Sequence, residues 1–128
     1  MIAGLASGSG KTMVTLGLLR ALARRGKAPA AGKTGPDYID PGFLSAAAGR
    51  KAVNLDQFAM SKPLLAHLAA DQAGDTLIIE GVMGLFDGAS GSAGSSAALA
   101  EALDIPVILV MDVRHTAQTA AMIAAGIA

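Results

Sequence analysis

The chain has 128 residues, with ten basic and ten acidic side chains, two histidines and no cysteine. This length suits one domain, and a hydrophobic content of 52% supplies enough apolar side chains for a core. The balanced charge argues against a nucleic-acid partner, no apolar run approaches the roughly 18 residues of a membrane span, and the lack of cysteine excludes a disulfide framework. We therefore expect a cytoplasmic protein that binds neither nucleic acid nor membrane.

Apolar segments alternate with helical patterns, which is typical of parallel strands joined by crossover helices. We predict an α/β fold, a parallel sheet with flanking helices. The first part is expected to hold a strand over Met1–Leu5, a helix over Lys11–Arg25 that ends at Gly26, and a strand over Lys27–Lys33. The apolar face of this helix is assigned to Val14, Leu18, Leu19 and Leu22.

The middle of the chain continues this alternation. Prolines and glycines oppose regular structure over Thr34–Gly42, so this segment is predicted to be a loop. Helical patterns follow over Phe43–Ala48 and Pro63–Ala73. Buried strands rich in apolar and β-branched residues are predicted over Thr76–Val82 and Pro106–Val113.

The remaining segments are rich in small residues. Between the last two strands, Met83–Ser95 is predicted to form a mobile lid and Ala97–Leu103 a crossover helix. Only three residues precede Gly4, although a central strand usually has about five or six. An alanine-rich helical pattern also runs from Thr119 to the last residue. We therefore expect the chain to be part of a longer protein.

The most specific motif is G-L-A-S-G-S-G-K-T, from Gly4 to Thr12, between the first strand and the first helix. Glycines let backbone N–H groups converge on phosphate oxygens, the lysine adds charge, the threonine hydroxyl can bind magnesium, and the helix N-terminus attracts anions. The predicted nucleotide-binding residues are Gly4, Ser7, Gly8, Ser9, Gly10, Lys11, Thr12 and Met13. The common pattern has glycine five residues before Gly10, where this chain has Leu5. This departure reduces the number of phosphate-loop families to which the chain can belong.

Charged residues at the carboxyl ends of predicted strands should converge on the same phosphates, because ligands bind there in open α/β sheets. Lys33 is placed to touch a terminal phosphate or a developing acyl phosphate; the alternative is a solvated strand end. Asp37 and Asp40 lie in a proline-bounded loop and could be simple turn formers. Beside a phosphate loop, we favour Asp37 as a ligand of magnesium or of its water shell.

Two further acidic residues complete the candidate catalytic set. Glu80 follows the apolar run T-L-I-I, where a buried carboxylate is costly unless it is paired with a cation or a metal. We interpret it as a magnesium contact, with a structural ion pair as the alternative. Asp87 is a weaker candidate because Asp-Gly is a common turn.

Four motifs, in this order and spacing, resemble the cobyrinic acid a,c-diamide synthases: G-x-x-S-G-S-G-K-T, K-T-G-P-D-Y-I-D-P-G-F, N-L-D-Q-F-A-M and I-I-E-G-V-M-G-L-F-D-G. The likeness covers essentially the whole chain. The third motif and the small-residue loop after Asp87 are more similar to the hydrogenobyrinic acid branch. The resemblance implies a P-loop NTPase fold of the dethiobiotin synthetase type and a glutamine-dependent ligase of cobalamin biosynthesis that uses ATP and Mg²⁺.

This resemblance also implies a mechanism, in which ATP phosphorylates a corrinoid carboxylate and ammonia displaces the phosphate, at the c and then the a position. By the likeness, Lys11 and Thr12 hold the phosphates and magnesium, Glu80 and Asp37 complete the metal environment, and Lys33 stabilises the transferred phosphoryl group. The positions that match family residues near the corrinoid or the intermediate are Tyr38, Ile39, Asp40 and Asp87.

The family's glutamine amidotransferase domain depends on a cysteine nucleophile, which this chain lacks. We therefore expect residues 1–128 to be a partial N-terminal synthase domain that receives ammonia from an amidotransferase domain outside this chain, and that is inactive alone. A homodimer is left open.

Three alternatives remain. A ParA-like or MinD-like ATPase switch shares the general fold, but such proteins carry a second lysine early in the loop, where this chain has Ala6. Cobyric acid and dethiobiotin synthetases are closer rivals, and P-D-Y-I-D-P and E-G-V-M-G-L-F-D-G argue against both. The third alternative is a folded fragment that only binds its ligands.

Overall fold

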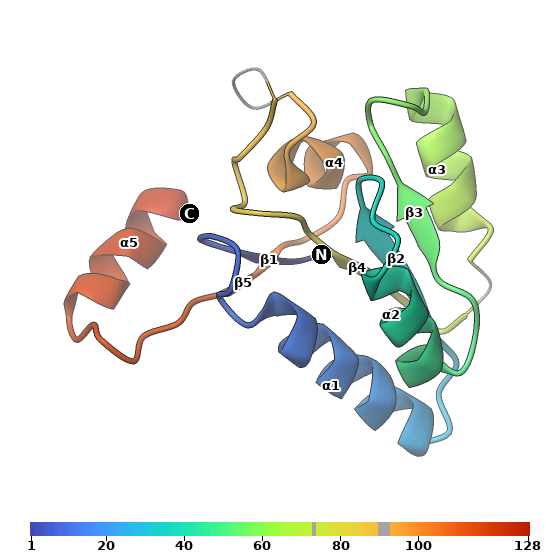
Figure 1. The fold of residues 1–128 in the computed structure, drawn as a ribbon, viewed down its shortest axis with the longest axis horizontal. Helices are drawn as coiled ribbons and strands as arrows, with labels where there is room; N and C mark the ends of the chain where they lie inside the picture. The colour runs from blue at the N-terminus through green and yellow to red at the C-terminus, as the bar shows by residue number, and fades with distance from the viewer. Residues whose placement is uncertain (73, 90–92) are drawn as a thin grey trace.

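The computed structural model describes residues 1–72, 74–89 and 93–128. Within these residues the strands form one parallel sheet with the order β3-β2-β4-β1-β5 (Figure 1). The strands are β1 Ile2–Gly4, β2 Pro29–Thr34, β3 Val53–Leu55, β4 Thr76–Glu80 and β5 Ile108–Val110. The helices are α1 Lys11–Arg24, α2 Asp40–Ala48, α3 Lys62–Ala70, α4 Ser96–Ala102 and α5 Thr119–Ile127. The predicted α/β fold is confirmed.

Helices α1 to α4 divide between the two faces of the sheet (Figure 1). The crossovers from β1 to β3 run in one direction and place α1 and α2 on one face, whereas those from β3 to β5 run back and place α3 and α4 on the other. Right-handed crossovers require this division. The core beneath α1 and α2 contains Ile2, Leu19, Ala31, Leu44, Ala48, Ala52 and Ile78. The core beneath α3 and α4 contains Met1, Leu55, Leu65, Ile79, Leu99 and Ala100.

The predicted apolar face of α1 is only half right. Leu19 is fully buried and Leu22 packs against the core, but Val14 and Leu18 are 37% and 39% exposed. The buried line of the helix instead follows Lys11, Thr15 and Leu19, at a spacing of four residues. Because this line begins at Lys11, the same face of α1 serves the core and the candidate site.

One prediction about the middle of the chain is wrong, and one strand was missed. The segment Thr34–Gly42 is not a loop throughout, because α2 begins at Asp40. Pro41 lies in the first turn of this helix, where a proline loses no hydrogen bond. The short strand β3 was not predicted, and it extends the sheet beyond β2 through the pairs Gly32–Val53, Lys33–Asn54 and Thr34–Leu55.

The other predicted elements are confirmed, with bounds that differ by a few residues. The strand predicted over Thr76–Val82 ends at Glu80, and the one over Pro106–Val113 contains only Ile108–Val110. The helix predicted to reach residue 73 ends at Ala70, and residue 73 lies outside the described residues. The predicted lid over Met83–Ser95 includes residues 90–92, which also lie outside them. Among the described residues, no helix combines the length and apolar character needed to cross a membrane.

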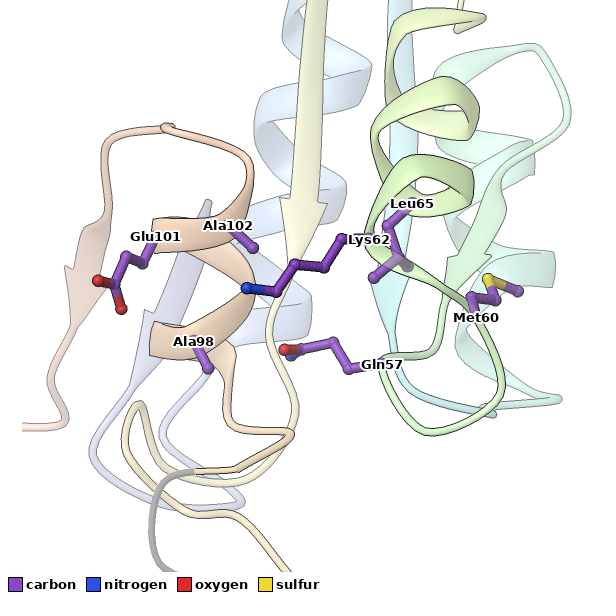
Figure 2. A pocket seen from close by; sticks show the side chains of 7 residues that line it. All are labelled: Gln57, Met60, Lys62, Leu65, Ala98, Glu101 and Ala102. Atoms are coloured by element: carbon purple, nitrogen blue, oxygen red, sulfur yellow. The ribbon is translucent and has the colours of Figure 1, made fainter.

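A cavity of about 480 Å³ lies between α3 and α4 (Figure 2). Its polar lining consists of Gln57, Lys62 and Glu101, and apolar side chains such as Met60 and Leu65 complete it. None of the predicted site residues lines this cavity. The candidate site therefore lies elsewhere, at the carboxyl ends of the strands.

Candidate nucleotide and metal site

The loop between β1 and α1 has the backbone that its glycines predict. Gly8 and Gly10 have φ angles of +80° and +91°, a region that other residues avoid. Gly10 is the N-cap of α1, no side chain caps this helix, and its first turn contains no acidic residue. The first N–H groups of α1 and the positive end of its dipole are thus available to an anion.

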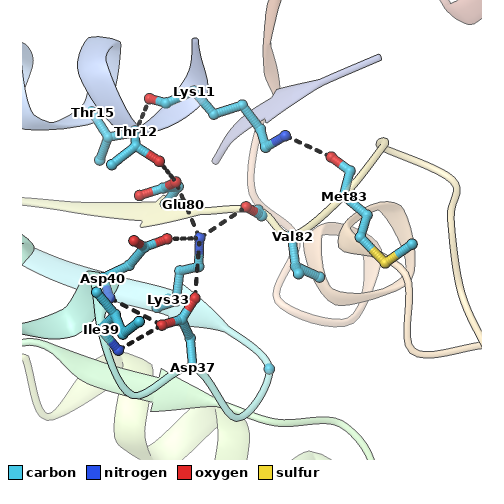
Figure 3. Close-up of polar contacts among 12 residues, drawn as sticks. Lys11, Thr12, Thr15, Lys33, Asp37, Ile39, Asp40, Glu80, Val82 and Met83 are labelled. Atoms are coloured by element: carbon cyan, nitrogen blue, oxygen red, sulfur yellow. Dashed lines mark hydrogen bonds and ion pairs between the residues drawn. The ribbon is translucent and has the colours of Figure 1, made fainter. Parts of the chain in front are cut away.

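Lys11 lies at the start of α1 with its side chain turned back over the loop. Its ammonium donates to the carbonyl oxygen of Ala6 at 2.8 Å. It also donates to the carbonyl oxygen of Met83 at 2.7 Å (Figure 3). Burial and the nearby charge of Lys33 lower the pKa of Lys11, while Glu80 and Asp87 act in the opposite direction. The lysine therefore connects the phosphate loop to the segment that follows β4.

The sheet changes from apolar to polar at its carboxyl edge. Ala31 of β2 pairs with Ile78 of β4 in the core beneath α1 and α2. Two residues further along, Lys33 pairs with Glu80 on one side and with Asn54 of β3 on the other. Because side chains alternate along a strand, this polar row faces the same side as the apolar row before it. The row lies next to the start of α1.

Glu80 lies between Thr12 and Lys33 in Figure 3. It is fully buried, and its Oε1 accepts hydrogen bonds from the Thr12 hydroxyl at 2.5 Å and from the Lys33 ammonium at 3.1 Å. Its Oε2 is buried and has no hydrogen-bond partner within the described residues. A carboxylate oxygen in this position is costly unless a cation or a donor reaches it. Glu80 thus makes an ion pair, as one interpretation predicted, and its contact with a metal stays a prediction.

Lys33 joins three carboxylates. Its ammonium donates to Asp40 Oδ2 at 2.6 Å and to Glu80 Oε1, and it lies 3.9 Å from Asp37 Oδ2. Burial lowers the pKa of Lys33, but the hydrogen bond to Asp40 and the charge of Glu80 outweigh burial and raise this pKa above its ordinary value. Lys33 is therefore a buried cation, and the alternative of a solvated strand end is wrong.

Asp37 has a local role in the loop before α2. Its Oδ1 accepts hydrogen bonds from the backbone N–H groups of Ile39 and Asp40, at 2.8 and 2.9 Å. Burial raises the pKa of Asp37, but the hydrogen bonds from these N–H groups and the charge of Lys33 lower it by more. The pKa of Asp37 therefore falls below its ordinary value. Asp37 is thus a turn former, as one interpretation predicted, and its second oxygen faces Lys33.

Most of the predicted site residues line one cavity of about 250 Å³. Its lining includes Ser7, Gly8, Lys11, Thr12, Lys33, Asp37, Asp40 and Glu80. A second cavity, of about 240 Å³, lies on the other side of the phosphate loop and shares Ser7 and Gly8 with the first. It is also lined by Asp112, which the sequence analysis did not assign.

Other predicted residues lie outside the lining of the first cavity. Tyr38 and Ile39 are 95% and 71% exposed, next to Asp37 and Asp40. Met13 is 76% exposed on α1 and contributes no side chain to the core. Asp87 is exposed, and its Oδ2 accepts a hydrogen bond from the backbone N–H of Gly84 at 2.8 Å. Asp87 thus shapes the turn after β4.

Gly4, Ser9 and Gly10 lie in or next to the phosphate loop and shape it. A Cβ on Gly4 would lie 2.1 Å from Ser9 Oγ, so a larger residue here would displace the Ser9 side chain. Ser9 Oγ donates to the carbonyl oxygen of Ala6. The displaced glycine of the motif therefore has a packing reason.

The site also contains residues that the sequence analysis did not assign. Gly81, Val82 and Met83 line the cavity, and Asn54 lies in the polar row. Their positions in the motifs I-I-E-G-V-M and N-L-D were visible, but small and apolar residues next to a strand end carry no chemical signal of their own.

The donor set suits a magnesium ion bound together with phosphates. The Thr12 hydroxyl and the free Glu80 Oε2 are hard oxygen ligands, which Mg²⁺ prefers. No cluster of three or more histidine, cysteine, aspartate or glutamate residues that could hold a metal occurs within residues 1–72, 74–89 and 93–128.

Comparison with known proteins assigns the chain to a family. The model of the CobQ/CobB/MinD/ParA nucleotide binding domain matches residues 1–126. The chain belongs to this family. Membership of the CobQ/CobB/MinD/ParA family agrees with the parallel sheet and the phosphate loop, and it makes this chain a nucleotide-binding domain.

Several curated relatives share more than half of their aligned residues with the chain. It is 56% identical over 127 residues to a protein of Mesorhizobium japonicum and 55% identical over 127 residues to one of Agrobacterium fabrum, covering 95% of this chain in each case. A protein of Rhodobacter capsulatus is 53% identical over 132 residues, covering 99% of this chain. All three are named hydrogenobyrinate a,c-diamide synthase. The chain spans only 29% to 30% of their lengths.

Proposed function

We propose that this chain is the ATP-binding synthase part of an enzyme that amidates the a and c carboxylates of hydrogenobyrinic acid, in cobalamin biosynthesis in the cytoplasm. The observation that carries the proposal is the contact of Glu80 with both Thr12 of the phosphate loop and Lys33 of β2. This contact brings a phosphate site and a buried cation to one cavity. The names of the relatives support the hydrogenobyrinic over the cobyrinic substrate.

In this proposal the phosphate loop binds the phosphates of ATP. Lys11 and the N–H groups at the start of α1 contact the phosphate oxygens. Thr12 and Glu80 hold Mg²⁺, with Asp37 contributing to the metal or to its water shell. When bound, the metal neutralises charge on the phosphates.

The reaction has two steps, and the protein contributes mainly position and charge. In the first, a substrate carboxylate oxygen attacks the terminal phosphorus of ATP, the bond to the leaving ADP oxygen breaks, and an acyl phosphate forms. In the second, the nitrogen of ammonia attacks the acyl carbon, phosphate leaves, and a proton is lost to give the amide. We assign Lys33 to the stabilisation of the transferred phosphoryl group, and its position in the same cavity as Lys11 and Thr12 supports this role.

We propose that the substrate binds beside the loop before α2. Tyr38 and Ile39 are large, exposed side chains next to the cavity, which suits contact with a large macrocycle. Asp40 lines the cavity and accepts a hydrogen bond from Lys33, and Asp87 lies at the turn after β4. We assign Tyr38, Ile39 and Asp40 to substrate binding, and Asp40 and Asp87 to the environment of the intermediate.

Ammonia is proposed to come from glutamine hydrolysed by an amidotransferase domain outside this chain. The proposal treats residues 1–128 as part of the N-terminal synthase domain of the longer protein, consistent with their coverage of 29% to 30% of the relatives. A homodimer remains compatible with this arrangement.

The second candidate function is an ATPase switch, because the family description also includes MinD and ParA. Such switches use a second lysine early in the phosphate loop. This chain has Ala6 there, and the carbonyl oxygen of Ala6 accepts a hydrogen bond from Lys11. The synthase is therefore favoured, and dimer-dependent ATP hydrolysis in the absence of a corrinoid would favour the switch.

The proposal is tested with the full gene product that contains this chain. Mg-ATP and then hydrogenobyrinic or cobyrinic acid are titrated by calorimetry, and amide formation is followed by mass spectrometry with ammonia supplied. We expect ATP-dependent addition of two amides to hydrogenobyrinic acid. The absence of any ATP-dependent amide product from either corrinoid would overturn the synthase assignment.

A further inference from the structure

Asn54 is the residue of the polar row that the proposed chemistry leaves without a role. It lies in the centre of β3, in register with Lys33 of β2. Its side-chain Nδ2 donates to the carbonyl oxygen of Gly35 at 2.9 Å and to that of Asp37 at 2.7 Å. Both acceptors belong to the loop that leads from β2 to α2. One side chain thus contacts this loop at two points.

The chemistry of these contacts is specific to an amide. An asparagine NH₂ group has two N–H donors, and here each one reaches a different backbone carbonyl. An aspartate of almost the same shape would present only acceptor oxygens to these carbonyls, and an aliphatic side chain would present nothing. The two carbonyl oxygens that accept from this one NH₂ group therefore explain why an asparagine occupies the centre of a strand, where this residue is usually disfavoured.

The same loop, from Gly35 to Asp40, carries four of the residues assigned to the reaction: Asp37, Tyr38, Ile39 and Asp40. The N–H of Gly35 donates to the carbonyl oxygen of Leu55 at 3.0 Å, which fixes the start of the loop to β3. The Asp37 carboxylate accepts hydrogen bonds from the N–H groups of Ile39 and Asp40. These bonds fix the end of the loop to α2. Asn54 holds the part in between, and from there Asp40 reaches Lys33.

We propose that Asn54 is a positioning residue for phosphoryl transfer: it holds the loop from Gly35 to Asp40 so that Asp37 and Asp40 face Lys33. This inference rests on the proposed synthase function. Its effect is exerted on the loop after β2 and not on the phosphate loop. Loss of Asn54 should therefore slow the chemical step and leave ATP affinity nearly unchanged.

The variants are Asn54→Ala, which removes both donors, and Asn54→Asp, which keeps the shape and reverses the polarity. The matched control is Gln57→Ala. Gln57 also uses a side-chain amide to hold a backbone carbonyl, that of Ser95 at 2.9 Å, but it lines the cavity between α3 and α4 (Figure 2). All variants are made in the full gene product, and their unfolding midpoints are measured first.

With ammonia, ATP and hydrogenobyrinic acid, Asn54→Ala is expected to lower kcat about tenfold or more, because small misplacements of a reacting geometry cost one to two orders of magnitude. Asn54→Asp should lower it further. The Kd of Mg-ATP should stay within about threefold of the parent value, and Gln57→Ala should leave kcat unchanged. An unchanged kcat in Asn54→Ala, or an equal loss of ATP affinity and kcat, would overturn the proposal.

A second measurement separates this inference from the proposed function. The N–H groups of Ile39 and Asp40 are bonded to Asp37, so their hydrogen exchange reports the order of the loop. Both amides should exchange about tenfold faster in Asn54→Ala and at the parent rate in Gln57→Ala. If the parent protein forms no amide, the synthase function fails, and the exchange rates still decide whether Asn54 holds the loop. Unchanged exchange would refute that role.

Discussion

Lys33 is the residue on which the charge balance of the site depends. It is the cation that contacts both Glu80 and Asp40, and Glu80 is fully buried. Burial of an ion pair is often close to neutral for stability, but removal of one partner leaves the other charge buried and uncompensated. The pair is therefore better explained by the chemistry of the site than by a need for stability.

This asymmetry gives a prediction for stability. Lys33→Met should lower the free energy of unfolding by about 3 kcal/mol or more, because Glu80 loses its cation. In a Glu80→Gln background the same substitution should cost at least about 1 kcal/mol less, because the buried charge is already absent. Urea denaturation of the parent, the two single variants and the double variant measures this coupling. Strictly additive costs would show that the two side chains do not interact.

The free oxygen of Glu80 gives a prediction for metal binding. Glu80→Gln keeps the shape and an acceptor for Thr12, but it removes the charge that favours a cation at Oε2. We expect the Mg²⁺-dependent part of ATP affinity to fall about tenfold or more, with a smaller effect on folding. Calorimetric titration of ATP with Mg²⁺ and with EDTA separates the two parts.

The control for this experiment is Glu101→Gln, an exposed carboxylate at the cavity between α3 and α4 (Figure 2). It should bind Mg-ATP like the parent. If Glu80→Gln also keeps the parent affinity in Mg²⁺ and loses only stability, Glu80 is a structural ion-pair partner and not a metal ligand.

At the scale of elements, two glycines at α1 differ in whether their backbone conformation requires glycine. Gly10 is its N-cap with a φ of +91°, whereas Gly17 lies in its exposed interior, with nothing within 4 Å of an added Cβ. Gly17→Ala should therefore raise the free energy of unfolding by about 0.5–1 kcal/mol, and Gly10→Ala should lower it by about 1–2 kcal/mol. Thermal unfolding with and without ATP measures both. A destabilised Gly17→Ala variant would contradict the assumed helix geometry.

The elements also show what could be predicted from the sequence. The phosphate loop and α1 were predictable because their signal is local, a fixed spacing of glycines followed by a helical pattern. The strand β3 was missed because Val53–Leu55 has three residues, with a polar one in the centre, and only pairing with β2 defines it. The start of α2 was missed because Pro41 resembles a loop residue, although a proline also suits a first helical turn.

The site was predicted in its residue types and not in its contacts. The sequence places Lys33 and Glu80 at strand ends, and the sheet order then brings together side chains that are 47 positions apart. The same topology makes Lys33 a partner of Asp40 and leaves Asp37 to close a turn. Such pairings depend on which strands are neighbours, which short motifs do not encode.

At the scale of the whole molecule, the loops of three strands meet at one edge of the sheet. Lys11 ties the loop after β1 to the segment after β4, and Lys33 ties the end of β2 to β4 and α2. Both cations thus connect parts of the fold that lie on different strands (Figure 3). A ligand that contacts both lysines would stabilise the molecule as a unit and not one loop alone.

Mg-ATP should therefore raise the unfolding temperature of the whole domain. A ligand at about 100 times its Kd adds about 2.7 kcal/mol to the free energy of unfolding, which corresponds to about 10 °C in Tm for a domain of this size. The effect should be smaller with EDTA, because Thr12 and Glu80 then lack the metal that the site is proposed to bind. Lys11→Ala is the matched control: it removes a phosphate contact from the loop and should abolish most of the shift. An equal shift in the parent and in Lys11→Ala would place the nucleotide outside the cavity at the carboxyl edge of the sheet.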